Sequence, residues 1–307
     1  MTRALVVINP ISGAGRPDGG GAAEVELARA GLAGAGYDAT VVVTKGPGHA
    51  TEATRQACAE GATLVVAWGG DGTMNEVARV LAFGPVALAL VPAGSGNGLA
   101  RDLGVPRAPA AALAAATTGR PWRIDAGAVN GSLFFNVAGL GLDARIAHAF
   151  AANRGRRGLV RYLEIGAREL LRYRAREYEI AWEAGRRAAA PALFVAIANS
   201  RQYGGHGCIA PGAVLDDGRL DLVVVDDLPL WRVLARVPGF FRGTLAPGGG
   251  VAMHACTSAR ISTPSAWELH LDGEPHAGDQ VIDVAVHRQA VTVIAPLDST
   301  TPHAPTG

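Results

Sequence analysis

The sequence predicts two domains of different fold class, an α/β domain with a parallel, helix-covered sheet and then an antiparallel β-sandwich. The chain has 307 residues, enough for two domains of ordinary size. Its first part alternates apolar runs with helical patterns, and its later part has short β-type runs separated by turns with Gly and Asp. We expect domains over 1–124 and 125–295, with the tail 296–307 either returning to the first domain or disordered.

The first domain is predicted from strands and helices that alternate along the chain. Its helical patterns cover Ala22–Leu32, His49–Ala59 and Asn75–Leu81. The runs between them are continuously apolar, which indicates strands buried on both faces, and they are Leu5–Ile8, Thr40–Val43, Leu64–Ala67 and Ala87–Val91. This alternation is typical of a parallel sheet covered by helices.

The second domain is predicted from a change near Ile124-Asp125, where alternating strand and helix patterns give way to short β-type runs. The β-type runs beyond this point are Leu133–Val137, Tyr178–Trp182, Leu193–Ala198, Leu220–Val225, Arg260–Thr263, Glu268–Leu271, Val281–Val286 and Val291–Ile294. Two helices are expected to interrupt them, at about 158–174 and 229–242. The many short strands with Gly and Asp turns favour an antiparallel sandwich or barrel.

Composition and charge exclude some function classes. Apolar residues make up 49% and charged residues 18%, a balance that fills cores and argues against disorder. The formal net charge of +1 leaves no global field to steer a nucleic acid, so no nucleic-acid partner is expected. The 3 cysteines lack metal-type spacing and indicate a reduced, cytoplasmic chain. We find neither a signal peptide nor an apolar run of the ~18 residues that a membrane span needs.

The strongest chemical signal is Gly69-Gly70-Asp71-Gly72-Thr73, followed by Asn75-Glu76. It stands between a predicted strand and a predicted helix, where glycines let the backbone approach phosphates and the helix N-terminus offers N–H groups to anions. An aspartate among phosphates would repel them unless it holds a metal or takes a proton, and Mg²⁺ is usually bound by carboxylates together with phosphate oxygens. A plain tight turn is the alternative.

Two further loops follow predicted strands. Pro92-Ala93-Gly94-Ser95-Gly96-Asn97 follows the fourth strand, so it should meet the first glycine loop at the carboxyl edge of the sheet. Asn9-Pro10-Ile11-Ser12-Gly13 follows the first strand; its Asn and Ser can bind a nucleotide or simply cap a turn. Both loops are therefore candidates for a nucleotide site.

Acidic turns mark the second domain. Asp272-Gly273-Glu274 presents two carboxylates at a strand end, where either can act as a general base or an indirect metal ligand, or where the segment is only a hairpin turn. Asp125 follows the boundary strand. The segment 216–221, with Asp217, is either a small cation site or a β-turn.

Taken together, these segments resemble the catalytic region of diacylglycerol kinases and the related sphingosine and ceramide kinases. The matching segments also include Thr44 with His49-Ala50, PAGSGNGLAR at 92–101, FFNVAGLGLDA at 134–144 and DDGRLD at 216–221. Their order and spacing along most of the chain carry the resemblance. It implies the fold of NAD kinases and diacylglycerol kinases, with the nucleotide between the domains.

The resemblance also implies roles for particular residues. Asp71 is the first candidate for base or Mg²⁺ handling and Glu274 the second, with Asp125 and Asp217 as further metal candidates. The expected nucleotide-binding residues are Asn9, Ser12, Gly13, Thr44, Gly69, Gly70, Gly72, Thr73, Gly94, Ser95, Gly96, Asn97, Arg156, Arg157 and Arg161. Many bacterial diacylglycerol kinases have an aspartate where this chain has Gly98, so the GSGN loop is more similar to the sphingoid-base branch.

We therefore expect an ATP-dependent (or other nucleoside triphosphate-dependent) lipid kinase that uses Mg²⁺ and acts in the cytoplasm, peripherally at a membrane. Eight arginines and two acids within Arg154–Arg176, and an apolar, aromatic and basic segment over Leu230–Arg242, suit a membrane surface or a core-facing helix. A kinase for a soluble hydroxyl, such as an NAD kinase or phosphofructokinase relative, is one alternative. A non-catalytic nucleotide- or lipid-binding protein is another, and a homodimer through a sandwich strand stays open.

Overall fold

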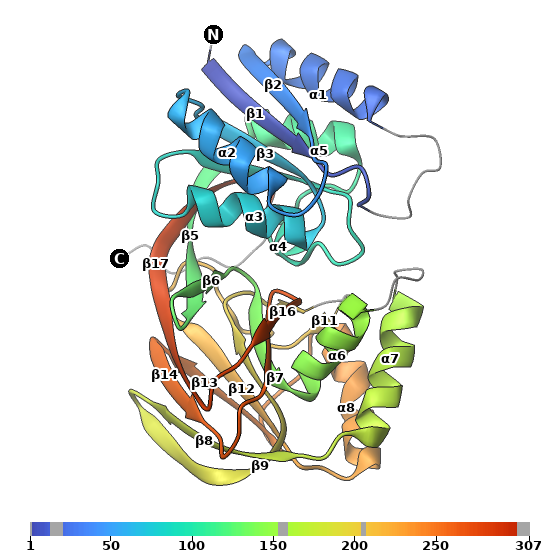
Figure 1. Cartoon of the computed structure of the whole chain (residues 1–307), viewed down its shortest axis with the longest axis vertical. Coiled ribbons are helices and arrows are strands. Elements are labelled where there is room, and N and C mark those ends of the chain that lie inside the picture. The colour runs from blue at the N-terminus through green and yellow to red at the C-terminus, as the bar shows by residue number, and fades with distance from the viewer. Residues whose placement is uncertain (1, 13–20, 153–158, 204–206, 300–307) are drawn as a thin grey trace. The chain divides into compact units, whose positions relative to one another are not determined.

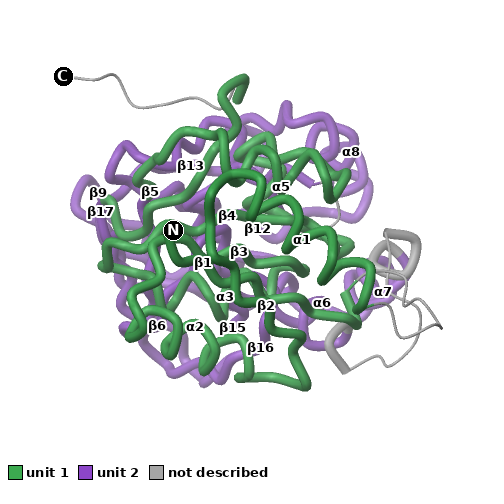
Figure 2. The backbone as a smooth tube through the Cα atoms, turned by 90° about the horizontal axis from the view of Figure 1, so that it is seen from above, with its two compact units in different colours: residues 1–124, 289–302 green, residues 125–288, 303–307 purple. Residues whose placement is uncertain are grey.

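The computed structural model describes residues 2–12, 21–152, 159–203 and 207–299 (Figure 1). These residues form two compact units, which Figure 2 colours separately. Unit 1 contains the described residues of 1–124 and 289–302, and unit 2 contains those of 125–288. The chain thus returns to unit 1 at residue 289, before the predicted end of the second domain at residue 295.

Unit 1 is built on a parallel sheet of five strands in the order β17-β4-β3-β1-β2. The β3 strand is buried along its whole length, as its continuously apolar sequence predicts. The strands are β1 (Thr2–Ile8), β2 (Tyr37–Val43), β3 (Leu64–Gly69), β4 (Ala87–Pro92) and the C-terminal part of β17 (Val281–Ala295). Because the strands are parallel, the loops after β1, β2, β3 and β4 lie at one edge of the sheet.

Helices cover both faces of this sheet (Figure 1). They are α1 (Ala22–Gly34), α2 (His49–Ala59), α3 (Asp71–Leu81), the short α4 (Gly98–Asp102) and α5 (Pro109–Thr118). The α1 helix packs with α5, and α2 packs with α3. The face of α3 that carries Val77, Ala78 and Leu81 is fully buried, which fixes the helix that follows the first glycine loop.

Unit 2 is antiparallel: its neighbouring strands, such as β12 and β13, β7 and β9, and β8 and β14, run in opposite directions. Its strands are β5 (Arg120–Val129, which begins in unit 1), β6 (Ser132–Phe134), β7 (Val137–Gly141), β8 (Arg176–Trp182), β9 (Gly185–Ala198), β10 (Gln202–Tyr203), β11 (Gly207–Cys208), β12 (Leu220–Asp226), β13 (Val251–Cys256), β14 (Ser258–Ser262), β15 (Glu268–Leu271), β16 (Glu274–Ala277) and the N-terminal part of β17. The predicted fold class, a parallel α/β sheet plus an antiparallel sandwich, is confirmed.

Alternate side chains of the unit 2 strands enter two apolar cores. On β9, Val195 and Ile197 belong to one core, whereas Ala196 and Ala198 belong to the other. The second core is closed by α8 (Leu230–Arg242), with α6 (Leu142–Ala152) and α7 (Leu159–Arg172) as the other helices of the unit. The period of two along the strands therefore explains how one sheet supports both cores.

Two strand predictions differ from the structure. The run Leu133–Val137 is split between β6 and β7, because the Asp272 carboxylate accepts the N–H groups of Phe135, Asn136 and Val137. The two runs 281–286 and 291–294 are instead parts of the single strand β17. The polar residues between the two runs resemble a turn in the sequence. In the structure the strand continues through them, with Gln289 in a left-handed conformation with φ of 51°.

Candidate active site

The predicted segments of unit 1 gather at the carboxyl edge of its parallel sheet. Asn9 follows β1, Thr44 follows β2, Gly70 follows β3, and the Pro92–Asn97 loop follows β4. The Thr44 N–H donates to the carbonyl of Ile8 at 2.8 Å, which extends the sheet past the end of β2. The convergence that the strand order predicts is therefore present in unit 1.

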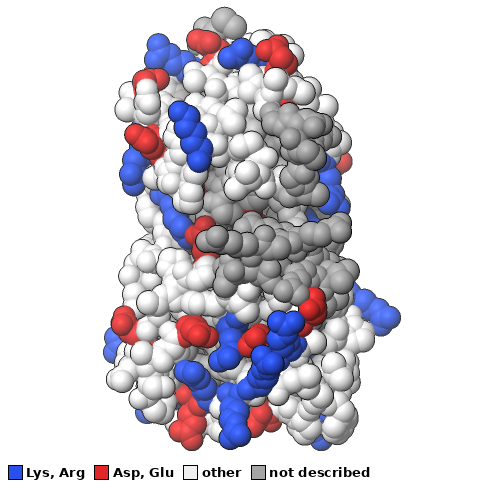
Figure 3. All heavy atoms as spheres, turned by 45° about the vertical axis from the view of Figure 1, so that its right-hand side comes forward, with Lys and Arg blue, Asp and Glu red and all other residues white. Residues whose placement is uncertain are grey.

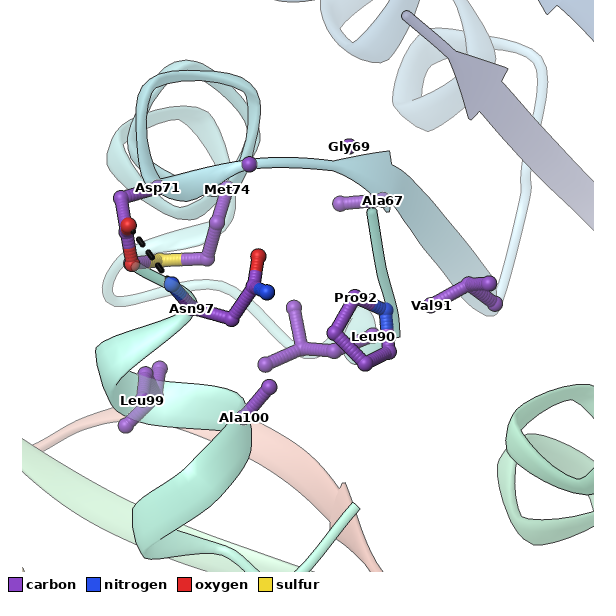
Figure 4. Close-up of a pocket in the computed structure, with 11 residues that line it drawn as sticks. Ala67, Gly69, Asp71, Met74, Leu90, Val91, Pro92, Asn97, Leu99 and Ala100 are labelled. Carbon is purple, nitrogen blue, oxygen red and sulfur yellow. Dashed lines mark hydrogen bonds between the residues drawn. The ribbon is translucent and has the colours of Figure 1, made fainter. Parts of the chain in front are cut away.

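Asp71 joins the two glycine loops. One carboxylate oxygen of Asp71, Oδ2, accepts the N–H of Asn97 at 2.8 Å, and the other, Oδ1, accepts the N–H of Gly98 at 2.7 Å. Figure 4 shows the Asp71 carboxylate turned toward the backbone nitrogen of Asn97, beside a small pocket that both residues line. Each oxygen of a carboxylate can accept more than one hydrogen bond, so Asp71 keeps acceptor capacity toward a ligand.

Asn97 fixes the shape of the second loop. Its side chain accepts the Gly94 N–H through Oδ1 at 2.9 Å and donates through Nδ2 to the Gly94 carbonyl at 2.6 Å. The residue is buried and has a φ of 55°, in the left-handed region where asparagine is better tolerated than most residues. The loop is thus preorganised by its own asparagine.

Glycines permit this close approach of the loops. A Cβ atom at Gly94 would lie 2.6 Å from the Cα of Gly70, and one at Gly96 would collide with the Asp71 carboxylate. At Gly69, a Cβ atom would lie 2.5 Å from the Thr73 Oγ1. Side chains at these positions would force the loops apart, which explains the glycines at 69, 94 and 96.

The NPISG segment is tied to the same cluster. Asn9 donates through Nδ2 to the Thr73 Oγ1 at 3.0 Å and accepts the Ile11 N–H through Oδ1 at 3.2 Å. The Ser12 N–H donates to the Asn9 carbonyl at 3.2 Å, which closes a turn, and Gly13 lies outside the described residues. Asn9 therefore connects the first loop to the start of α3.

The start of α3 is suited to an anion. Its N-cap residue, Gly70, has no side chain and makes no side-chain cap bond, so the helix begins with N–H groups that face the loop region. The helix has 11 residues, and its Glu76 accepts the N–H of Thr51 at 3.2 Å, which anchors α3 to α2. A phosphate is the kind of ligand that such a helix start binds.

In unit 2, the Asp272-Gly273-Glu274 turn is held in the same way as the loops of unit 1, by an aspartate carboxylate that accepts backbone N–H groups of a distant segment. We call each of these two arrangements a clamp. Asp272 has a φ of 52° and Gly273 a φ of 81°, as a tight turn requires. Asp272 accepts the N–H groups of Phe135 at 2.8 Å, Asn136 at 2.7 Å and Val137 at 3.0 Å. Asp272 is therefore occupied by backbone, and Glu274 stands next to it at the start of β16.

A buried charged pair lies behind this turn. The His270 Nε2 is 2.8 Å from the Asp143 Oδ2, and the two side chains are only 4% and 3% exposed. The Gly273 N–H donates to the His270 Nδ1 at 3.1 Å, which ties the imidazole to the turn. Burial opposes the imidazolium, but the Asp143 and Asp272 charges outweigh it and raise the pKa of His270.

The predicted metal residues are divided between the two units. Asp71 belongs to unit 1, whereas Asp125 and Asp217 belong to unit 2. The Oδ2 of buried Asp125 accepts the Gly218 N–H at 2.6 Å, and Asp217 accepts the Arg219 N–H at 2.9 Å. Burial raises the pKa of Asp217 against the opposing effect of Arg219. Across the described ranges, no three His, Cys, Asp or Glu side chains converge as metal ligands would.

The predicted arginines are placed only in part. Arg156 and Arg157 lie outside the described residues, and Arg161 falls in α7, where only its backbone is described. The structure adds Arg101, which sequence reasoning did not select and whose guanidinium donates to the Ser95 carbonyl at 3.4 Å. Its place at the end of the matching segment 92–101 was the signal in the sequence that could have indicated it.

His270 and Asp143 were also missed. An alternating strand would point His270 away from its neighbours Leu269 and Leu271, toward solvent. In the structure that face is covered by α6, which contacts β15 and carries Asp143. Asp143 lies within the segment GLGLDA, but nothing in the sequence paired it with a histidine 127 residues away.

Comparisons with known proteins agree with this geometry. The family model of the diacylglycerol kinase catalytic domain matches residues 3–129, and that of the YegS C-terminal NAD kinase beta sandwich-like domain matches residues 136–295. A Pseudomonas aeruginosa protein named "Probable lipid kinase YegS-like" is 35% identical over 272 residues, 83% of this chain and 84% of that protein. A Bacillus subtilis protein named diacylglycerol kinase is 29% identical over 291 residues, 89% of this chain and 90% of its own.

Solved structures show the same fold. A Bacillus anthracis diacylglycerol kinase superposes with a TM-score of 0.74 at 21% identity and covers 97% of this chain and 98% of its own. An NAD kinase from Archaeoglobus fulgidus, solved with ATP, gives a TM-score of 0.54 at 12% identity, over 96% of this chain and 94% of its own. The fold is thus that of the diacylglycerol kinases and NAD kinases, and the family models and named relatives define the class as a phosphotransferase.

The chain belongs to the diacylglycerol kinase family. This confirms the predicted resemblance and the predicted enzyme class, a kinase that transfers a phosphoryl group from a nucleotide. Among the described residues, no helix combines the length and the apolar character that crossing a membrane requires.

Proposed function

We propose that this protein transfers the γ-phosphoryl group of ATP, or of another nucleoside triphosphate, to a hydroxyl group of a lipid. The observation that carries the proposal is the Asp71 clamp, which holds two glycine loops against each other at the start of α3. Loops that are fixed in advance and rich in N–H groups are what phosphoryl transfer needs, because its catalysis is mostly positioning and charge stabilisation. The names of the relatives, which are lipid and diacylglycerol kinases, support the acceptor class.

The nucleotide is assigned to the carboxyl edge of the unit 1 sheet. Ser95 and Gly72 are both exposed, so the Ser95 hydroxyl and the backbone of Gly72 can meet a ligand at the surface of the loops. The proposed set contains the predicted residues of this edge, namely Asn9, Ser12, Thr44, Gly69, Gly70, Gly72, Thr73, Gly94, Ser95, Gly96 and Asn97. Arg101 adds a positive charge to the same loop.

Mg²⁺ is the metal that this chemistry uses, and Asp71 fits it. Mg²⁺ is usually bound in such sites by one or two carboxylates plus phosphate oxygens and water, so a cluster of three protein ligands is not required. Asp71 is half-buried and keeps lone pairs beyond its two backbone bonds. When bound, the ion would neutralise charge that develops on the phosphates.

We propose that Asp71 or Glu274 takes the proton of the attacking hydroxyl. In the proposed step the lipid hydroxyl oxygen forms a bond to the γ-phosphorus, the bond to the β,γ-bridging oxygen breaks, and the nucleoside diphosphate leaves. The hydroxyl proton passes to one of these two carboxylates. Asp71 keeps acceptor capacity for it, since each of its oxygens accepts only one backbone N–H group. Asp272 is excluded by its three backbone bonds.

A lipid acceptor implies that the enzyme acts at a membrane surface, and a nucleotide donor implies that it acts in the cytoplasm.

A kinase for a soluble hydroxyl is the second candidate, because the chain shares its fold with an NAD kinase. Labelled ATP offered with an extracted lipid pool, with NAD and with fructose 6-phosphate separates these candidates. We expect a labelled lipid product identified by mass. Label only in NAD or the sugar would contradict the lipid proposal, and nucleotide binding without transfer or hydrolysis would indicate a non-catalytic protein.

A further inference from the structure

The α8 helix exposes apolar side chains on one face. Of the ten large apolar side chains that are exposed among the described residues, four belong to this helix. Trp231 is 66% exposed, Leu234 54%, Leu230 44% and Val237 38%. Positions 230, 234 and 237 are spaced by four and three residues, so they form a stripe along one side of the helix, with Trp231 beside it.

Other residues of α8 pack the helix against unit 2. Val233 and Phe240 contact the core that includes Val223 and Val251, and the Phe240 ring lies 5.7 Å from that of Tyr203. No residue of α8 is fully buried. The exposed stripe is therefore not needed to hold α8 in place, and the interpretation of this segment as only a core-facing helix is incomplete.

The charges of α8 are all positive. Between Leu230 and Arg242 the chain has three arginines and no acid, although Asp226 and Asp227 precede the helix. Arg232 is exposed, with its guanidinium 5.1 Å from the centre of the Trp231 ring, and Arg242 is exposed in the last turn. Arg236 is held by the Gly248 carbonyl at 2.6 Å.

The surface around the helices of unit 2 is also rich in basic groups. Figure 3 looks toward the side that carries α6, α7 and α8 and shows Lys and Arg gathered in its lower part, with acidic side chains among them. On α7 the acids are paired, since Glu164 lies 3.1 Å from Arg168 and Glu169 lies 2.7 Å from Arg145. Pairing leaves less negative charge to oppose an anionic partner.

We propose that α8 docks on an anionic lipid bilayer, inserting Leu230, Trp231 and Leu234 at the headgroup boundary while Arg232 and Arg242 contact the lipid phosphates. This inference rests on the proposed lipid kinase function and names the surface through which the enzyme meets its substrate. Indole rings favour the bilayer interface, arginine stems can lie along apolar surface with the charge at the phosphates, and an amphipathic helix gains from both. Neutral protein partners would not use the arginines.

The test is flotation of the full-length protein with vesicles of phosphatidylcholine alone or mixed with phosphatidylglycerol, without nucleotide. We expect binding to the mixed vesicles and little binding to the neutral ones. The double variant Trp231→Ser/Leu234→Ser should bind mixed vesicles at least ~10-fold more weakly. The variant Arg232→Glu/Arg242→Glu should lose the preference for phosphatidylglycerol. Leu297→Ser, which alters a side chain that is 72% exposed in unit 1, serves as the matched control and should bind normally.

Activity measurements separate this inference from the proposed function. On a short-chain, monomeric form of the lipid that is labelled in the extracted pool, the double variant should keep the wild-type rate, while on mixed vesicles that contain this lipid its rate should fall in parallel with binding. Wild-type protein that labels no lipid of the pool, as monomers or in vesicles, but still floats would contradict the proposed function and leave the docking surface supported. Flotation of the double variant at the wild-type level would overturn the docking surface. Dimerisation of the wild type in solution that the double variant loses would also overturn it, by assigning the face to a second copy of the chain.

Discussion

Two aspartates, one in each unit, use their carboxylate oxygens to hold a distant segment of backbone. Asp71 of unit 1 binds a loop 26 and 27 residues further along the chain, and Asp272 of unit 2 binds a turn that precedes it by more than 130 residues. Asp71 is half-buried beside glycines, whereas the turn of Asp272 is backed by the buried His270–Asp143 pair. Unit 1 is thus organised by backbone and glycine, and unit 2 by buried side-chain charge.

This difference predicts where each unit is sensitive. Unit 1 should lose activity when the clamp is weakened, because the loops that receive the phosphates depend on it directly. Unit 2 should lose stability when its charged pair is disturbed, and its stability should respond to pH. The variants below test these expectations, from the largest effect to the smallest.

Of the three variants that test this difference between the units, Asp71→Asn should have the largest effect. An amide that replaces the carboxylate cannot accept both the Asn97 and Gly98 N–H groups and loses the charge proposed to hold Mg²⁺. We expect a folded protein whose phosphoryl transfer is reduced at least ~100-fold. Rates with labelled ATP and circular dichroism measure the two properties. Asp38→Asn, on an exposed part of β2, is the control, and an unchanged turnover of Asp71→Asn would remove Asp71 from the chemistry.

Gly139→Ala should reduce stability. A Cβ atom at residue 139 would collide with the Asp143 carboxylate and the His270 ring, so the buried pair would have to move. Overpacking of this kind usually lowers the free energy of unfolding by about 1–3 kcal/mol. Urea unfolding measures the change. Gly212→Ala, where a Cβ atom would meet nothing within 4 Å, is the matched control, and equal stability of the two variants would contradict the tight packing around the pair.

His270→Asn should change the pH dependence of stability. Burial opposes the imidazolium, but Asp143 and Asp272 raise the pKa of His270 in the folded state above the ordinary histidine value of about 6.5. The folded state then binds the proton more tightly than the unfolded state. The stabilisation is therefore complete below about pH 6.5 and is lost as the pH rises through the higher, folded-state pKa.

Urea unfolding at several pH values tests this sign. The excess stability of the wild type over His270→Asn should be larger at acidic pH and should shrink toward alkaline pH. A constant difference across this range would show that the pair does not take up a proton on folding. A difference that grows with pH would show that burial, rather than the two aspartates, dominates the pKa of His270.

The sequence could predict the fold well where local pattern and tertiary structure agree. Each continuous apolar run of the first domain is a strand of the parallel sheet, and β3 is buried along its whole length as such a run predicts. The edge strand β2 is an exception to the expected burial, because it has a neighbouring strand on one side only and none of its residues is fully buried. The helix α5 was not predicted, since its run of alanines has no amphipathic period. The strands β13 and β16 were also missed, being short and mixed in character.

The candidate site was predictable to the extent that it lies in contiguous motifs. Glycines around Asp71 and Asn97 indicated close backbone approach, and the structure shows which atoms require it. The roles of Asn9 and Asp272 as clamps could not be predicted, because their backbone and hydroxyl partners depend on tertiary contacts. The same holds for His270, whose burial depends on α6. Local sequence patterns indicate where the backbone needs glycine, but contacts between residues that are distant in the sequence can be recognised only in the folded chain.

The central claim is that phosphoryl transfer needs two carboxylates, that of Asp71 in the first glycine loop and that of Glu274 in the Asp272-Gly273-Glu274 turn. Glu274→Gln tests it most directly, with ATP affinity and lipid phosphorylation measured on the same preparation and Glu268→Gln, an exposed glutamate of β15, as control. The account predicts an ATP affinity equal to that of the wild type and a transfer rate reduced ~10²–10⁴-fold. Transfer at the wild-type rate would contradict it.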